Sequence, residues 1–147
     1  MPNEGTGNDA FLSELDIRIW MRDNNPEANI LLQDYEFTPE EIRTCMTLAV
    51  DKWNETPPAI ARHSHTIADF PYRGELLRGT CGNLLFAAAM RFRRNELQVS
   101  IPGGVVSDQS KYNQYDAAGD RLWREFVSWI HMKKRAINME EGWALIS

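Results

Sequence analysis

The residue types best suited to chemistry in this 147-residue chain are its three histidines. His63 and His65 form an H-x-H pair close to Asp69, and on an exposed strand such a pair can bind a metal ion. A third ligand at a suitable spacing is missing, so the other interpretation is a surface loop over residues 59–71. His131 has no nucleophile or carboxylate at a recognisable spacing. The sequence therefore predicts no catalytic, metal or cofactor site, and we expect no enzyme activity.

Two further features could meet phosphate groups. Gly103 and Gly104 lie in the segment LQVSIPGGVV, but this segment lacks the spacing and the lysine of a phosphate-binding loop. Arg91, Arg93 and Arg94 either contact phosphate or form the charged end of a helix, where cations suit the helix dipole. A small nucleic-acid-binding protein is therefore an alternative function, and its basic surface would combine these arginines with Lys133, Lys134 and Arg135.

Charge is unevenly distributed along the chain. Residues 1–56 carry 12 acidic and 4 basic side chains, whereas residues 57–147 carry 9 and 12. The asymmetry describes either two differently solvated faces or a polarity that orients a subunit and repels a polyanion from one side. No run approaches the roughly 20 apolar residues of a membrane span, and residues 1–10 do not resemble a signal peptide. We therefore expect Cys45 and Cys81 to be reduced, buried thiols.

The clearest structural element is a helix within residues 37–58, FTPEEIRTCMTLAVDKWNETPP. Thr38 and Glu41 have the spacing of a capping box, with Pro39 at the first helical position. Pro57 and Pro58 prevent the helix from continuing. Its predicted buried stripe comprises Ile42, Met46, Ala49 and Trp53.

Apolar periodicity predicts four more helices, at residues 9–22, 26–33, 74–95 and 109–137. The first has a predicted stripe of Phe11, Leu15 and Ile19. Small residues such as Gly79 and Gly82 allow another helix to approach the third closely. The last is apolar on both flanks, which suits either an interface or a centrally buried helix.

Two segments break this helical pattern. Leu97, Val99 and Ile101 alternate with polar residues before Pro102 and a glycine pair, which predicts a β-hairpin over residues 97–106. Residues 138–147 are rich in apolar side chains and must dock on this domain or on a partner. The sequence thus predicts a mainly α fold: a flexible arm (1–8), a bundle of about four to five helices (9–137) with one hairpin or extended loop, and an extended C-terminal docking tail (138–147).

Three phrases in the chain resemble virion proteins of tailed bacteriophages. They are the F-T-P-E-E-I helix ending in W-N-E-T-P-P, the segment V-S-I-P-G-G-V-V-S-D, and the ending W-x-x-F-x-x-x-x-x-x-K-K-x-x-I-N-x-x-x-G-W. Within that group, residues 10–147 are most similar to the head–tail connector, or neck adaptor, family. These adaptors are small helical bundles, and the length after residue 137 departs from their compact pattern.

The resemblance implies a structural virion protein, assembled in the host cytoplasm, with no catalysis, no cofactor and no membrane contact. It implies a homo-oligomeric ring, commonly a dodecamer, that joins the portal protein to tail or neck proteins. DNA would pass through the ring without sequence-specific binding. A different neck or baseplate position is the alternative within this group. The expected interface residues are Val99, Ile101, Gly103, Gly104, Val105, Trp123, Trp129, Met139, Trp143, Leu145 and Ile146.

Overall fold

The computed structural model describes residues 12–28, 34–58, 64–98 and 106–146. In these ranges the chain is helical and contains no strand, so the prediction of a mainly α bundle is confirmed. The elements are α1 (Glu14–Met21), a short 3-10 helix η2 (Pro26–Ala28), α2 (Pro39–Glu55), α3 (Arg73–Gln98) and α4 (Val106–Ile146).

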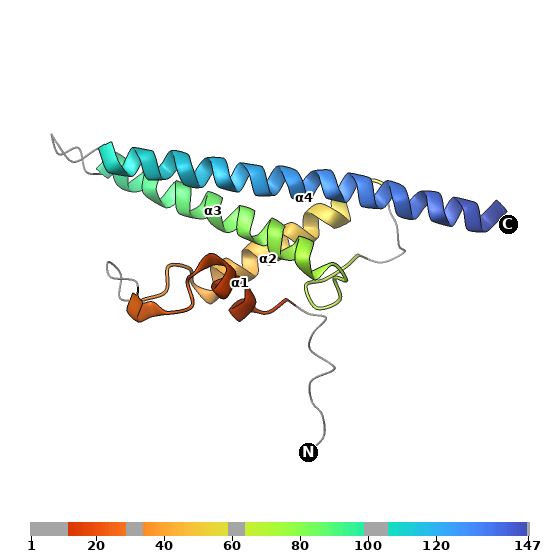
Figure 1. The fold of residues 1–147 in the computed structure, drawn as a ribbon, viewed down its shortest axis with the longest axis horizontal. Helices are drawn as coiled ribbons and strands as arrows, with labels where there is room; N and C mark the ends of the chain where they lie inside the picture. Colours follow the sequence, from red (N-terminus) through yellow and green to blue (C-terminus); the bar gives the residue numbers. More distant parts are fainter. Residues whose placement is uncertain (1–11, 29–33, 59–63, 99–105, 147) are drawn as a thin grey trace, which may run out of the picture.

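The two longest helices form the body of the molecule. Figure 1 shows α3 and α4 lying side by side and antiparallel, with α2 crossing α3 and α1 beside α2. The end of α4 continues well past the point where α3 begins. The bundle therefore has a long two-helix spine, a smaller pair of helices against α3, and one projecting helical end.

Capping interactions set where α1 and α2 begin. Thr38 Oγ1 accepts a hydrogen bond from Glu41 N at 3.1 Å, and Glu41 Oε2 accepts one from Thr38 N at 2.8 Å. The predicted capping box of α2 is therefore confirmed. Ser13 and Asp16 form a second capping box, so α1 begins at Glu14 and is shorter than the predicted helix.

In the predicted helix at residues 26–33, the structure describes only the first turn, residues 26–28. Asn25 Oδ1 accepts a hydrogen bond from Glu27 N at 3.1 Å, as expected of a residue that caps a helix. The turn that follows is the 3-10 helix η2, and residues 29–33 lie outside the described part.

A close approach of α3 to α4 depends on glycines. A Cβ built on Gly119 would lie 3.0 Å from Gly82 O and 3.2 Å from Leu85 Cβ, and one on Gly79 would lie 2.9 Å from the Phe126 ring. A side chain at Gly119 would push the backbones of α3 and α4 apart. The apolar core forms around this contact and includes Ile42, Ala49, Trp53, Leu76, Leu84, Phe126 and Ile130.

The prediction of a hairpin over residues 97–106 is wrong at its two ends. Leu97 and Gln98 are the last residues of α3 and Val106 is the first of α4, so neither end of the predicted hairpin is a strand; residues 99–105 lie outside the described ranges. Extending an existing helix adds a hydrogen bond for each residue, whereas a lone two-stranded hairpin is marginal in water.

The predicted extended tail is the second wrong prediction. α4 continues through residues 138–146, where no proline interrupts it and the glycine at 142 costs only about 1 kcal/mol relative to alanine. The apolar residues after Ile137 are therefore carried on a helix.

The glycine contact gives a stability prediction. We expect Gly119→Ala to lower the free energy of unfolding by about 1–2 kcal/mol, because overpacking against Gly82 O outweighs the gain in helix propensity. Urea unfolding followed by circular dichroism measures the change.

Gly142→Ala is the matched control, because a Cβ at Gly142 meets no atom within 4 Å. It should leave stability unchanged or raise it by up to about 1 kcal/mol. Equal stability of the two variants would contradict a contact set by glycine.

Candidate interaction surfaces

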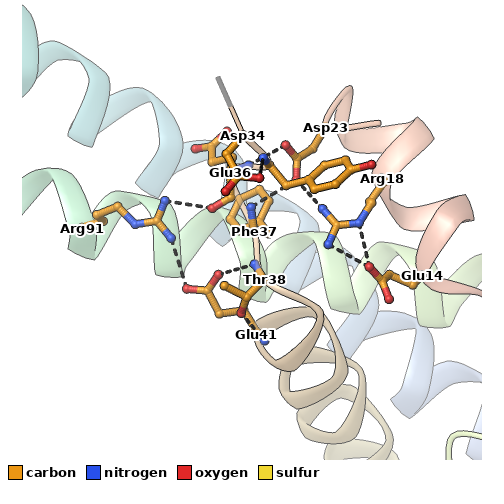
Figure 2. Close-up of polar contacts among 10 residues, drawn as sticks. Glu14, Arg18, Asp23, Asp34, Glu36, Phe37, Thr38, Glu41 and Arg91 are labelled. Carbon is orange, nitrogen blue, oxygen red and sulfur yellow. Dashed lines mark hydrogen bonds and ion pairs between the residues drawn. The ribbon is translucent and has the colours of Figure 1, made fainter. Parts of the chain in front are cut away.

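A buried ionic network fixes α1 against the start of α2 (Figure 2). Arg18 is only 5% exposed and lies 2.8 Å from a carboxylate oxygen of both Glu14 and Asp23. Asp23 also accepts hydrogen bonds from Glu36 N at 2.7 Å and Phe37 N at 3.1 Å. Because every strong partner of this buried pair lies within the chain, the network holds structure together and offers little to a ligand.

Arg91 extends the same network to α3. Its guanidinium donates to Glu36 O at 3.0 Å and to a Glu41 carboxylate oxygen at 3.1 Å, as Figure 2 shows. Burial raises the pKa of Glu36, and the positive charge of Arg91 opposes this shift. Arg91 therefore joins α3 to the first turn of α2 and is largely engaged within the fold.

This network leaves one face of α1 uncovered. The side chains of Leu15, Ile19 and Trp20 are 59%, 47% and 52% exposed, whereas Ile17 and Arg18 point inward. The predicted buried stripe through Leu15 and Ile19 is therefore wrong. The bonds of Arg18 hold Arg18 on the buried side of the helix, and the predicted stripe lies about a quarter turn or more away from that side. We call the three exposed residues the α1 face, and they are one candidate interaction surface.

The other end of α2 is closed by a lysine from α4. Lys134 is 2% exposed, and its Nζ donates to Trp53 O and Thr56 O, at the point where α2 stops before Pro57. Nζ also lies 4.9 Å from the centroid of the Trp53 ring. The ammonium group thus meets carbonyls that a helix end leaves free, and it sits at the negative end of the dipole. Burial lowers the pKa of Lys134.

Trp123 and Trp129 were expected at an interface, and both pack against the core. The Trp129 ring lies 5.4 Å from the Trp53 ring and 5.0 Å from the Tyr72 ring, and Trp123 lies 5.5 Å from Phe126. Both tryptophans are half-buried in this single chain. Their aromatic surface therefore mainly stabilises the contact of α4 with α2 and α3.

The described contacts of α4 with the bundle end at Ile137. The next four side chains, at residues 138–141, are exposed, and Gly142 has no neighbour within 4 Å of its would-be Cβ. We call residues 138–146 the α4 overhang; it is about 14 Å long at 1.5 Å per residue. Met139 is 63% exposed on it, and Met132 just before it is 66% exposed.

The side chains of the remaining predicted interface residues lie outside the part of the chain that the structure describes. Trp143, Leu145 and Ile146 occupy helical positions on the overhang, but their side chains lie outside the described part. Val99, Ile101, Gly103, Gly104 and Val105 also lie outside it.

The basic residues do not form one surface. Arg93 donates to Tyr112 Oη at 3.4 Å near the start of α4, whereas Lys134 lies 22 residues further along the same helix, about 33 Å away. Arg91 and Lys134 are also bonded inside the bundle. This separation weakens the nucleic-acid-binding alternative, which needs a continuous basic patch.

Of the residues considered for chemistry, His65, Cys45 and Cys81 are bonded or buried, whereas His131 is exposed on α4. No three His, Cys, Asp or Glu side chains there are grouped as a metal site would require, and His63 lies outside it. His65 lies 3.4 Å from Asp69, and Asn54 bonds both the amide and the carbonyl of His65. Cys45 and Cys81 are free thiols, as expected, and burial raises their pKa to about 11 and about 12.

Comparisons with known proteins identify no relative. A scan against models of protein families, a search of curated proteins and a search of solved structures each found no match. No helix in the described ranges is both long and apolar enough to cross a membrane.

Little in the sequence indicates that Lys134 is buried, because a lysine near a helix end is usually a solvated charge. We predict that Lys134→Met lowers the free energy of unfolding by about 1–3 kcal/mol, since it removes the ammonium donor from the carbonyls of Trp53 and Thr56 at the end of α2. Urea denaturation measures the difference.

Arg135→Met is the control, because Arg135 is exposed and its replacement removes the same positive charge one residue away. It should change stability by less than about 0.5 kcal/mol. If both variants unfold at the same urea concentration, Lys134 does not hold the end of α2.

Proposed function

We propose that this chain is a structural head–tail connector of a tailed bacteriophage, a neck adaptor that forms a ring between portal and tail. The observation that carries the proposal is a pair of separate exposed apolar surfaces on one small bundle. One is the α1 face, with Trp20 52% exposed, and the other is the outer side of α4 around Met132 and Met139. The resemblance of the chain to adaptor proteins supplies the particular role.

A closed ring requires two different surfaces on each subunit. Its contacts are heterologous, so one patch of each copy meets another patch of the next copy. Figure 1 shows α1 beside α2 below the spine and the C-terminal end of α4 projecting beyond the bundle, so the two surfaces are separate. The ring is proposed to be a dodecamer that contacts portal and tail or neck proteins through the remaining surface.

The acidic first third of the chain suits a channel that DNA traverses. Glu14, Glu40 and Asp51 are exposed on α1 and α2, within the part of the chain that carries 12 acidic and 4 basic residues. Such a surface repels the phosphate backbone and keeps DNA from adhering. The proposed role is therefore passive passage of DNA, without sequence recognition or catalysis.

Purified virions test the function directly. Mass spectrometry should detect the protein in intact particles, and electron microscopy should place it in a ring between portal and tail. Its absence from virions would refute the proposal, and density in the baseplate would favour the alternative structural position.

The overhang gives a second test in the purified protein. We expect deletion of residues 138–147 to leave the bundle folded, because the contacts described for the core end at Ile137, while ring assembly is lost. Circular dichroism and urea unfolding measure the fold, and electron microscopy of complexes with portal measures assembly. A deletion that unfolds the bundle would show that the overhang belongs to the core.

A further inference from the structure

The outer side of α4 carries an apolar stripe that its own bundle does not cover. Met132, Ala136 and Met139 are all exposed, and they line a shallow open depression together with Ser128, His131 and Arg135. Trp143 and Ile146 follow in the same register along the helix. The successive spacings of 4, 3, 4 and 3 residues are those of the seam between two helices in a coiled coil. We call these five positions the α4 stripe.

This stripe faces away from the bundle. Ile130 and Ile137 pack on the core, and Met132 and Met139 each follow two residues later, about 160° away around the helix. Past Ile137 the exposed Glu141 lies on the core-facing side of the helix, next to the positions of Ala144 and Leu145. Met132 and Met139 lie on the other side, away from α2 and α3.

A second helix along the α4 stripe would remove the exposed side chains of Met132 and Met139 from water.

We propose that the α4 stripe binds the α4 stripe of a second copy of this chain, and that the two helices run antiparallel. In this register position 132 lies opposite position 143 of the second copy, and position 136 lies opposite its position 139. A parallel pair would set each position against itself, so that the alanine position 136 would meet a second alanine position and the tryptophan position 143 a second tryptophan position.

Charge at the edge of the stripe is complementary in the antiparallel register. Lys133 and Glu140 lie seven residues apart on the same edge. In an antiparallel pair, Lys133 of one helix faces Glu140 of the other, and the two-fold axis repeats this ion pair. A dimer so formed is self-complementary in both shape and charge.

The pairing does not depend on the connector role, but it bears on it. An isologous pair closes on itself and cannot be a contact within a cyclic ring. A subunit that enters a ring must therefore release its pair, which would keep the overhang covered before assembly.

The oligomeric state of the purified full chain is the first test. Sedimentation equilibrium should show a monomer–dimer equilibrium in the micromolar range. If the wild-type protein stays monomeric up to about 100 µM, the association free energy is weaker than about 5 kcal/mol and the proposal is overturned. The proposal is also overturned if the Met139→Lys variant forms a dimer as stable as that of the wild type.

Charge reversals test the antiparallel register. Lys133→Glu alone and Glu140→Lys alone each set like charges against one another twice, and each should weaken dimerisation about tenfold. An equimolar mixture of these two variants should restore it, because both edge pairs of the mixed dimer are then attractive. Circular dichroism confirms that each variant is folded.

Glu141→Lys is the matched control, because it makes the same charge change on the opposite side of the overhang. It should leave the dissociation constant within about twofold of wild type. A failure of the mixture to restore dimerisation, or an equal effect of Glu141→Lys, overturns the pairing. Neither result affects the virion test of the connector role.

Discussion

The structure depends on the contact between α3 and α4, where two helix backbones meet through glycine. Gly82 and Gly119 bring the carbonyl of one helix against the Cα of the other, so no side chain separates them. Gly79 admits the ring of Phe126 in the same way. Close approach increases van der Waals contact along both helices, and it fixes their relative position more precisely than larger, adaptable side chains would. The spine is thus rigid enough to carry a helix end beyond the bundle.

Cations from this spine hold α2 at both ends. Arg91 of α3 binds Glu41 in its first turn, and Lys134 of α4 binds the carbonyls of Trp53 and Thr56 at its end. Capping by local residues alone leaves a helix free to move as a body, whereas these bonds tie α2 to both long helices. The ionic network of Arg18 and Asp23 then attaches α1 to the start of α2. Charge in this protein is used largely to connect elements, and apolar surface is left for contacts outside the chain.

That division explains where the candidate surfaces lie. The α1 face is exposed because Arg18, rather than Leu15 or Ile19, occupies the inner side of its helix. Met132 and Met139 of the α4 stripe are exposed because they lie on the side of α4 opposite Ile130 and Ile137, which pack on the core. Both surfaces are helical, separate and apolar, which is the arrangement that a subunit of a larger assembly requires. The proposed dimer and the proposed ring would be two uses of this arrangement.

Local signals in the sequence determined the helical class and the position of α2, because a capping box, a proline at the first turn and a proline pair at the end act within a few residues of the chain. They also identified the small residues of α3 and the buried thiols. The extended tail and the two ends of the predicted hairpin were wrong, since short apolar alternation and polar interruptions do not outweigh continued hydrogen bonding along a helix. Only the tertiary structure decided that Lys134 is buried and that Leu15 is exposed. A lysine's environment depends on carbonyls some 80 residues away, and the buried side of a short helix depends on which polar groups it must satisfy, so neither is encoded in local spacing.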